Sequence, residues 1–345
     1  MLVSTSAQLY GLKNFYEKKE GSMMKKFLVG LSLMLMVGFV LVGCEGDTSP
    51  DNEAADNGGN GDSYVEILDV LSTFSVISDM IVQVGGQHVD VTTIVPIGET
   101  PEDYEFTPGD VINATNADVI FYNGLEFEHE YEWFENLMET AGREKDVDFF
   151  ALTDGLAAVR LLSEGLEDYY DPHLWMDPLL GMGYIDNIVA ILSDFMPEAA
   201  DYFVANGAAM NEALQAIYDE FSGHFDEIPA AQNLLVTAEG AFRYLGYAFG
   251  INTGFIWEFN AEDEGTPEQF IRIIEIVNAS EVRYLFVESS IDPDYIEQVS
   301  GETSVPIWDE YLFTDSLSEA NGPAATYLAF LRHNLETIYA GLTAE

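Results

Sequence analysis

Three carboxylates and one imidazole lie just past apolar segments of the chain or in a Pro-containing loop, where binding sites of parallel-sheet proteins collect polar groups. Glu102 follows the apolar run at 91–95, Glu239 follows "LLVTA", and Asp315 follows "IWDEYLFT". His173 lies in the loop "YDPHLWMD". One imidazole and three carboxylates are side chains that can coordinate a divalent metal ion. Because acids occur throughout this chain, spacing alone does not single these four residues out.

The composition limits the classes of protein that could hold such a site. The 345 residues include 12 Lys and Arg against 61 Asp and Glu, a formal net charge of −49. The acids are spread along a chain that is 48% hydrophobic, so we predict a folded, acid-coated domain rather than a disordered acidic tail. Such a surface suits a protein that works in high salt, where screening weakens self-repulsion. The sequence offers no basic patch, which argues against nucleic-acid binding.

The N-terminal segment has the features of a bacterial lipoprotein signal. Two lysines precede the apolar run "FLVGLSLMLMVGFVLVG", which ends at the single cysteine, Cys44. This order is typical of a secretory signal peptide, and "LVGC" resembles a lipobox. We predict that residues 1–43 are removed, with 1–22 as an upstream extension if translation starts at Met23 or Met24, and that Cys44 is lipidated. The alternative is a plain signal peptide or a signal anchor in which the cysteine is incidental.

Residues 44–63 have no apolar period and are rich in Gly, Asn and Asp, so we predict a disordered acidic tether. A lipidated cysteine followed by a tether would hold a soluble domain at the outer face of the cytoplasmic membrane, in an extracellular or periplasmic setting. We expect that domain to act as a monomer.

From residue 64 onward, short apolar runs alternate with amphipathic segments, a pattern typical of β-α-β units and parallel sheets. An N-terminal lobe at 64–196 is predicted to contain strands within 65–74, 89–95, 118–124 and 148–155. A C-terminal lobe at 230–345 is predicted to contain strands within 233–240, 252–259, 282–290 and 305–313, and a closing helix at 324–342.

Residues 197–229 carry apolar side chains at helical spacing and no strand signal, which predicts one long rigid helix of up to about thirty residues. Within the C-terminal lobe, Thr266, Pro267 and Gln269 have the spacing of a helix N-cap with a capping box. We therefore predict an α/β fold with two lobes, each a parallel sheet flanked by helices, joined by the long helix. Two lobes on a rigid connection suit a ligand held in the cleft between them.

Seven motifs resemble the metal-binding receptors of manganese and zinc ABC importers, the cluster A-I solute-binding family, some of whose members are lipoprotein adhesins. The motifs, in chain order, are "VPIGETPEDYEFTPGDV", "ADVIFYNGLEFE", "DPHLWMD", "VTAEGAFRYLGYAFG", "EGTPEQ", "LFVESS" and "FTDSLSE". The similarity runs from residue 64 to the C-terminus with motif order and spacing kept. The resemblance implies two lobes bridged by a long helix and a four-ligand metal site in the cleft.

The resemblance also places the family's metal ligands on residues of this chain. The His of "DPH" is His173, the Glu of "AEGAF" is Glu239, and the Asp of "FTDS" is Asp315. The first ligand departs from the family pattern "PIGxDPHxYEP", because Glu102 stands where the family has His. Asp103 is the competing carboxylate. We expect Glu102, with the other three residues, to bind the metal.

The expected donor set favours one class of metal. One nitrogen and three carboxylates suit Mn²⁺ or Fe²⁺ better than Zn²⁺, which prefers nitrogen and sulfur donors. Zinc-type members of the family often have a His-rich loop after the "FYNG" strand, where this chain has only His129. We therefore favour Mn²⁺, with Zn²⁺ or Fe²⁺ as alternatives, since the Irving–Williams order still favours zinc. Asp171, Trp175 and Glu288 are candidates for the surroundings of the site, although core or surface positions explain them equally well.

These features predict a lipid-anchored receptor, not an enzyme, that captures Mn²⁺ and delivers it to an ABC permease and its ATPase. The alternative from another class is a surface adhesin with a structural metal. A metallohydrolase is disfavoured, because "HEYEW" lacks the HExxH spacing and four protein ligands leave little room for an activated water.

The lipid anchor is tested by Cys44→Ser. Because the acyl chains of a lipoprotein are attached through the cysteine, the variant should move from the membrane fraction to the soluble fraction, as measured by immunoblot. A variant that stays on the membrane as firmly as the unchanged protein would show that Cys44 is not the anchor.

Overall fold

The computed structural model describes residues 66–102, 104–128, 132–259 and 265–344. The predicted signal peptide, Cys44 and the tether lie outside the described residues, as do Asp103 and His129. From residue 66 onward the chain groups into one compact unit by its contacts. No helix within the described residues is both long enough and apolar enough to cross a bilayer.

A four-stranded parallel sheet occupies the first half of the described chain. Its strands are β1 (Leu68–Ser72), β2 (Val89–Thr93), β3 (Val119–Tyr122) and β4 (Phe149–Ala151), in the order β2-β1-β3-β4. Strand β1 pairs with both β2 and β3, so that Val70 lies opposite Val91 and Val119. The inner strand β3 is buried at every position, as expected for a parallel sheet covered on both faces.

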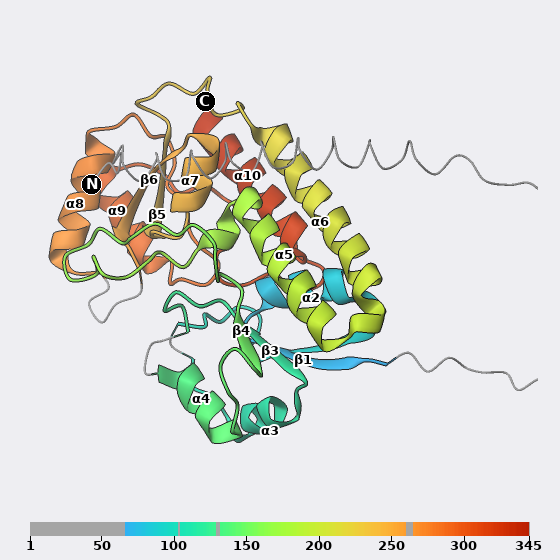
Figure 1. Ribbon diagram of the computed structural model, residues 1–345. Coiled ribbons are helices and arrows are strands. Elements are labelled where there is room, and N and C mark those ends of the chain that lie inside the picture. The colour runs from blue at the N-terminus through green and yellow to red at the C-terminus, as the bar shows by residue number, and fades with distance from the viewer. Residues whose placement is uncertain (1–65, 103, 129–131, 260–264, 345) are drawn as a thin grey trace, which may run out of the picture. The chain divides into compact units, whose positions relative to one another are not determined.

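Helices cover the two faces of this sheet (Figure 1). They are α2 (Ser75–Gly85) on one face, and α3 (Pro108–Asn116) and α4 (Trp133–Ala141) on the other. The α3–α4 face forms a core in which Leu71 and Ile120 of the sheet pack with Ala114 of α3 and Leu137 of α4. This burial fixes the sheet, whose carboxyl edge leads into the loops that carry the predicted site.

Two long helices follow β4. They are α5 (Pro178–Phe195) and α6 (Ala200–Phe221), which pack on each other and on α2. Helix α6 lies inside the segment predicted as one long helix, but it has 22 residues and spans about 33 Å. It ends early because Ser222 leaves the helical region with a ψ of 123°, and the chain turns through Gly223 at a φ of +83°, which glycine adopts without strain. The lobe boundaries at 196 and 230 stay predictions.

A second parallel sheet consists of β5 (Leu234–Glu239) and β6 (Asn252–Trp257). The helices around it are α7 (Arg243–Phe249), α8 (Pro267–Asn278), α9 (Asp294–Thr303) and α10 (Tyr327–Thr343). The prediction of strands at 282–290 and 305–313 was wrong. These segments pair only through isolated parallel bridges, Leu285 with Ile307 and Glu288 with Leu312. Pro306 has no N–H to donate and the chain bends at 309–310, so a continuous ladder does not form.

The start of α8 agrees with the sequence. Thr266 Oγ1 accepts the N–H of Gln269, and Gln269 Oε1 accepts the N–H of Thr266. Pro267 occupies the first helical position, as predicted. These two hydrogen bonds confirm the predicted capping box. The sequence could predict it because it depends only on residues three apart.

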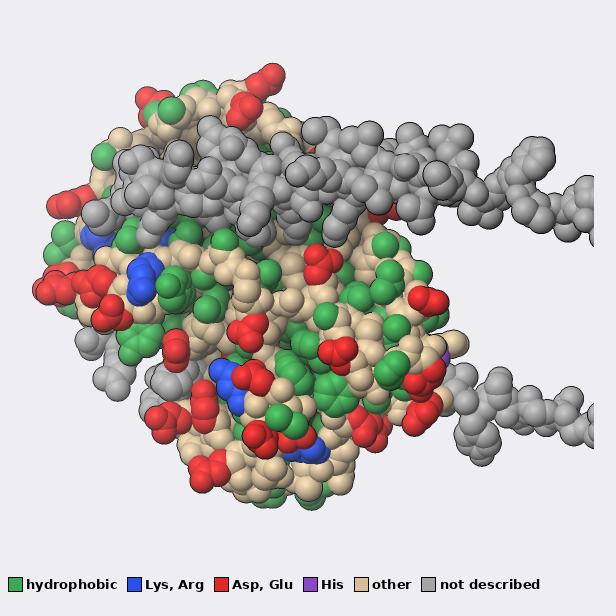
Figure 2. All heavy atoms as spheres, in the orientation of Figure 1, with side chains coloured by type: hydrophobic (Ala, Val, Ile, Leu, Met, Phe, Trp, Pro, Cys, Tyr) green, Lys and Arg blue, Asp and Glu red, His purple; other side chains and the backbone are tan. Residues whose placement is uncertain are grey.

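The surface is acidic, as the composition predicts. Figure 2 shows Asp and Glu side chains spread over the face in view, with few Lys and Arg among them. Arg143 and Arg160 donate guanidinium N–H groups to backbone carbonyls. Arg143 donates to the carbonyls of residues 114, 115 and 117. Arg160 donates to those of residues 167 and 168. These arginines are therefore structural as well as charged.

The turn after β5 passes very close to the end of β6. Gly240 follows Glu239 directly, and a Cβ added at Gly240 would lie 2.5 Å from the backbone oxygen of Glu258. Real atoms do not approach so closely, so only glycine lets the two backbones meet here. The position of Glu239 therefore depends on a glycine.

Gly240→Ala should lower the free energy of unfolding by about 1–3 kcal/mol, the usual cost of overpacking. The matched control is Gly301→Ala in α9, where nothing lies within 4 Å of the added Cβ. That variant should be neutral or more stable by about 0.4–1 kcal/mol, because alanine restricts the unfolded chain. Urea denaturation at fixed high salt measures both. If both variants lose the same free energy of unfolding, the close approach of Gly240 to the Glu258 backbone is not what limits this position.

Candidate metal centre

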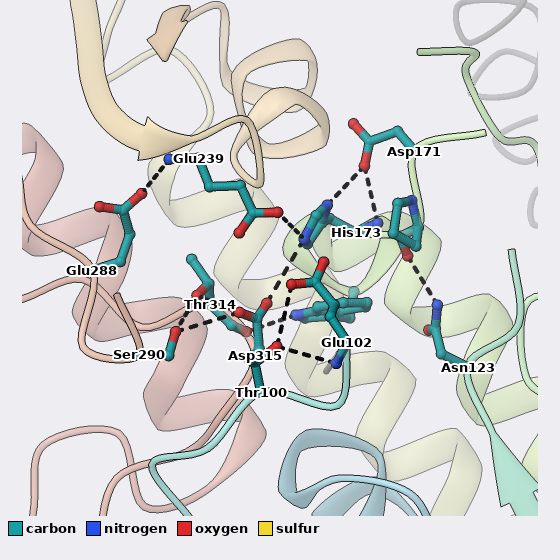
Figure 3. Close-up of polar contacts among 12 residues, drawn as sticks. Thr100, Glu102, Asn123, Asp171, His173, Glu239, Glu288, Ser290, Thr314 and Asp315 are labelled. Carbon is teal, nitrogen blue, oxygen red and sulfur yellow. Dashed lines mark hydrogen bonds and ion pairs between the residues drawn. The ribbon is translucent and has the colours of Figure 1, made fainter. Parts of the chain in front are cut away.

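The structure brings together the four residues expected from sequence as ligands (Figure 3). Glu102, His173 and Glu239 offer donor atoms that all lie within 4.8 Å of one another. Asp315 falls outside this group of three, but its Oδ1 lies 3.7 Å from His173 Nε2, as does Glu239 Oε1. Donors 3.7 Å apart can each lie about 2.1 Å from one shared ion. The spacing therefore suits a divalent metal.

The four side chains come from both halves of the fold. Glu102 lies in the loop between β2 and α3, and His173 precedes a single 3-10 turn at Leu174–Met176 that leads into α5. Glu239 is the last residue of β5, and Asp315 lies between the bridge at Leu312 and α10. Carboxyl ends of parallel strands and their loops thus supply the site, as in other open α/β folds.

All four side chains are buried: Glu102 is 2%, His173 0%, Glu239 1% and Asp315 1% exposed. Burial raises the pKa of the Asp315 carboxyl above its ordinary value. Ionised carboxylates gathered away from water repel one another and cost free energy unless a cation or protons neutralise them. The chemistry of the donor set therefore fits a bound cation.

Asp171 fixes the orientation of the imidazole. Its Oδ1 accepts the backbone N–H of His173 at 3.1 Å and lies 2.9 Å from Nδ1. With Nδ1–H assigned as the donor to Asp171, Nε2 keeps its lone pair for a metal. Among the described residues, nothing forms a hydrogen bond with Nε2. The ring also packs against Trp175, with centroids 5.1 Å apart.

A buried arginine joins Asp171 to the β5–α7 turn. Arg243 Nη1 lies 3.5 Å from Asp171 Oδ2 and donates to Glu258 Oε1 at 2.6 Å. Glu258 Oε2 in turn accepts the N–H groups of Leu162 and Ser163. Because Arg243 lies four residues after Glu239, this network links the segments that carry two of the expected ligands.

Glu288 holds the end of β5. Its carboxylate accepts the N–H groups of Glu239 at 2.9 Å and Ala238 at 3.2 Å. Burial raises the pKa of Glu288 to about 7. Glu288 therefore positions the backbone of Glu239, and its own side chain is engaged by these N–H groups.

The Glu102 loop is tied at several points. Thr100 Oγ1 lies 3.3 Å from both Glu102 Oε2 and the Glu102 N–H. Trp133 Nε1 donates to the carbonyl of Pro101 at 2.8 Å, and Gly98 N donates to Ser316 Oγ at 2.8 Å. The last bond connects this loop to the residue after Asp315.

Sequence reasoning did not identify Arg243, Glu258, Ser290 or Thr314 as parts of the site. Arg243, Ser290 and Thr314 lie inside the motifs "EGAFR", "ESS" and "FTDS", so the sequence places them in segments that resemble the family. The sequence does not reveal their hydrogen-bond partners, because those partners lie in other segments. Of the residues left open, Asp171, Trp175 and Glu288 all lie beside the site.

Comparison with known proteins identifies the family. The chain matches the family described as zinc-uptake complex component A, periplasmic, over residues 70–341. It is 36% identical over 276 residues to the manganese ABC transporter substrate-binding lipoprotein PsaA of Streptococcus pneumoniae, covering 80% of this chain and 89% of PsaA. It is 38% identical over 276 residues to the iron ABC transporter substrate-binding lipoprotein MtsA of Streptococcus pyogenes, with the same coverage.

Solved structures show the same fold. The Mn-bound periplasmic metal binding protein from Candidatus Liberibacter asiaticus superposes with a TM-score of 0.70 at 29% identity, covering 80% of this chain and 99% of that one. The periplasmic zinc binding protein TroA from Treponema pallidum superposes with a TM-score of 0.72 at 25% identity and the same coverage. The predicted two-lobed α/β fold class is confirmed. The chain belongs to the zinc-uptake complex component A family of metal-binding substrate-binding proteins, as its motifs predict.

Proposed function

We propose that this chain is the lipid-anchored receptor of an ABC importer, which captures Mn²⁺ outside the membrane and delivers it to the permease and its ATPase. The observation that carries the proposal is the buried group of Glu102, His173 and Glu239, with Asp315 beside it. Membership of a family of metal-binding substrate-binding proteins supports the transport role. Relatives named as substrate-binding lipoproteins support the anchor at Cys44.

The preference for Mn²⁺ rests on the donor set. Glu102 contributes oxygen where the family pattern has an imidazole, which leaves one nitrogen among the four expected ligands. Oxygen-rich sites suit Mn²⁺ and Fe²⁺, whereas Zn²⁺ prefers nitrogen and sulfur. Relatives named for manganese and for iron support the same class of ion. Zn²⁺ and Fe²⁺ stay the alternatives.

The role requires binding and release, and no covalent chemistry. The carboxylates attract a dication electrostatically, and Asp171 keeps Nε2 of His173 ready to coordinate it. Glu102 and His173 come from one half of the fold, and Glu239 and Asp315 from the other. A permease that separated the halves would divide the ligand set and free the ion. We propose that the receptor does this as a monomer.

Binding of the ion should raise the melting temperature, because the cation removes repulsion among buried carboxylates. Free ligand at about 1,000 times its dissociation constant adds about 4 kcal/mol to the free energy of unfolding. Thermal melts of chelator-treated protein with and without Mn²⁺, at fixed high salt, measure the effect. An unchanged midpoint with Mn²⁺, Fe²⁺ and Zn²⁺ would contradict the site.

Glu102→His should raise the ratio of Zn²⁺ to Mn²⁺ affinity by about tenfold, or about 1.4 kcal/mol, because it adds a nitrogen donor and removes a negative charge. Glu102→Gln should weaken Mn²⁺ binding while keeping the side-chain shape. Competitive titration measures both.

The matched control is Asp103→Asn, since Asp103 is the competing carboxylate and lies outside the described residues. It should leave the affinities unchanged. If Asp103→Asn abolishes binding and the Glu102 variants do not alter it, Asp103 is the ligand and Glu102 is not.

A further inference from the structure

The two carboxylate oxygens of Asp315 have different surroundings (Figure 3). Oδ2 accepts hydrogen bonds from Thr314 Oγ1 at 3.1 Å and Ser290 Oγ at 3.3 Å. Oδ1 lies 3.7 Å from His173 Nε2, is buried, and makes no hydrogen bond within the described part of the chain. One oxygen is therefore satisfied by the protein and the other is directed to the site.

The two hydroxyl groups form a small cluster with Oδ2. Ser290 Oγ and Thr314 Oγ1 lie 3.0 Å apart. Each hydroxyl has one hydrogen, so either both donate to Oδ2 or one donates through the other. In both arrangements Oδ2 accepts at least one hydrogen bond.

Thr314 is held in place by the segment that carries His173. Trp175 Nε1 donates to the carbonyl of Thr314 at 3.0 Å, and Trp175 itself is fully buried. The neighbouring Ser289 N–H donates to the carbonyl of Leu312 at 2.8 Å, which keeps the Ser290 and Thr314 segments together. The hydroxyl pair is thus built into the fold.

We propose that Ser290 and Thr314 are positioning residues that restrict Asp315 to one metal-binding oxygen, Oδ1, and so limit the coordination number of the site. This inference rests on the proposed metal-binding function. When both hydroxyls donate, they occupy both lone pairs of Oδ2. For Oδ2 to coordinate an ion as well, at least one of these hydrogen bonds would have to break, and a lost bond at the buried Thr314 hydroxyl costs free energy. Asp315 therefore binds through a single oxygen.

The restriction acts differently on different ions. Zn²⁺ is satisfied by four donors, whereas Mn²⁺ favours octahedral, oxygen-rich coordination. Excluding one carboxylate oxygen from coordination therefore lowers the binding affinity for Mn²⁺ more than the affinity for Zn²⁺. It lowers the affinity for an ion that the receptor has to release.

The test is the double variant Ser290→Ala/Thr314→Val, which removes both hydroxyls and nearly keeps the side-chain volumes. With Oδ2 free to coordinate, the ratio of Zn²⁺ to Mn²⁺ affinity should fall by about tenfold, at the lower end of the 10- to 100-fold effects of residues around metal ligands. The visible absorption of bound Co²⁺ should weaken as its coordination number rises. Thr314→Ser, which keeps a hydroxyl, should behave as the unchanged protein.

The matched control is Ser300→Ala/Thr303→Val in α9, whose hydroxyls donate to the backbone carbonyls of Val305 and Val299. It should change neither the affinity ratio nor the Co²⁺ spectrum. Equal losses of Zn²⁺ and Mn²⁺ affinity in the double variant, with an unchanged Co²⁺ spectrum, would overturn the inference and leave the metal site intact. Failure of the unchanged protein to bind any divalent ion would instead overturn the proposed function.

Discussion

The burial of carboxylates without matching cations is the constraint on which this structure depends. Nine Asp and Glu side chains are buried, against one arginine, Arg243, among the described Lys and Arg; the acids are Glu102, Asp110, Glu128, Asp171, Asp177, Glu239, Glu258, Glu288 and Asp315. Several are satisfied by backbone N–H groups, as Asp177 is by Leu179 and Glu128 by Asn123 and Gly124. Glu102, Glu239 and Asp315 gather beside His173. The first group stabilises loops and helix ends, and the second forms the candidate metal centre.

The same distinction explains how the acids around the site differ in role. Glu288 accepts two N–H groups at the end of β5, and Glu258 accepts two more at residues 162 and 163. Hydrogen bonds of this kind hold a carboxylate in place and occupy its lone pairs. These acids therefore position backbone and are poor candidates for ligands. Burial distinguishes both kinds of carboxylate from the surface acids, and acceptance of backbone N–H groups marks Glu258 and Glu288 as positioning residues.

Local patterns in the sequence were sufficient to predict most of the fold. The capping box at Thr266 depends on residues three apart, and the alternation of apolar runs and helices predicted both parallel sheets. The strands expected at 282–290 and 305–313 failed because Pro306 and a bend interrupt their pairing, which apolar content does not reveal. The candidate ligands were found through motifs and one substitution, Glu102 for His. The roles of Arg243 and Thr314 could not be predicted, because their partners Asp171 and Trp175 are remote in sequence.

Polar bonds between the two halves of the fold surround the site. Trp175 donates to Thr314, Gly98 donates to Ser316, and Arg243 pairs with Asp171. All three join protein groups to protein groups, so they form without a metal. The repulsion among the buried carboxylates opposes them, and a bound dication would remove that repulsion. A ligand shifts a conformational equilibrium only by its difference in affinity for the two states. On the proposed function, the difference between the empty and the loaded receptor therefore comes mainly from the charge of the ion, and not from contacts that the protein makes with itself.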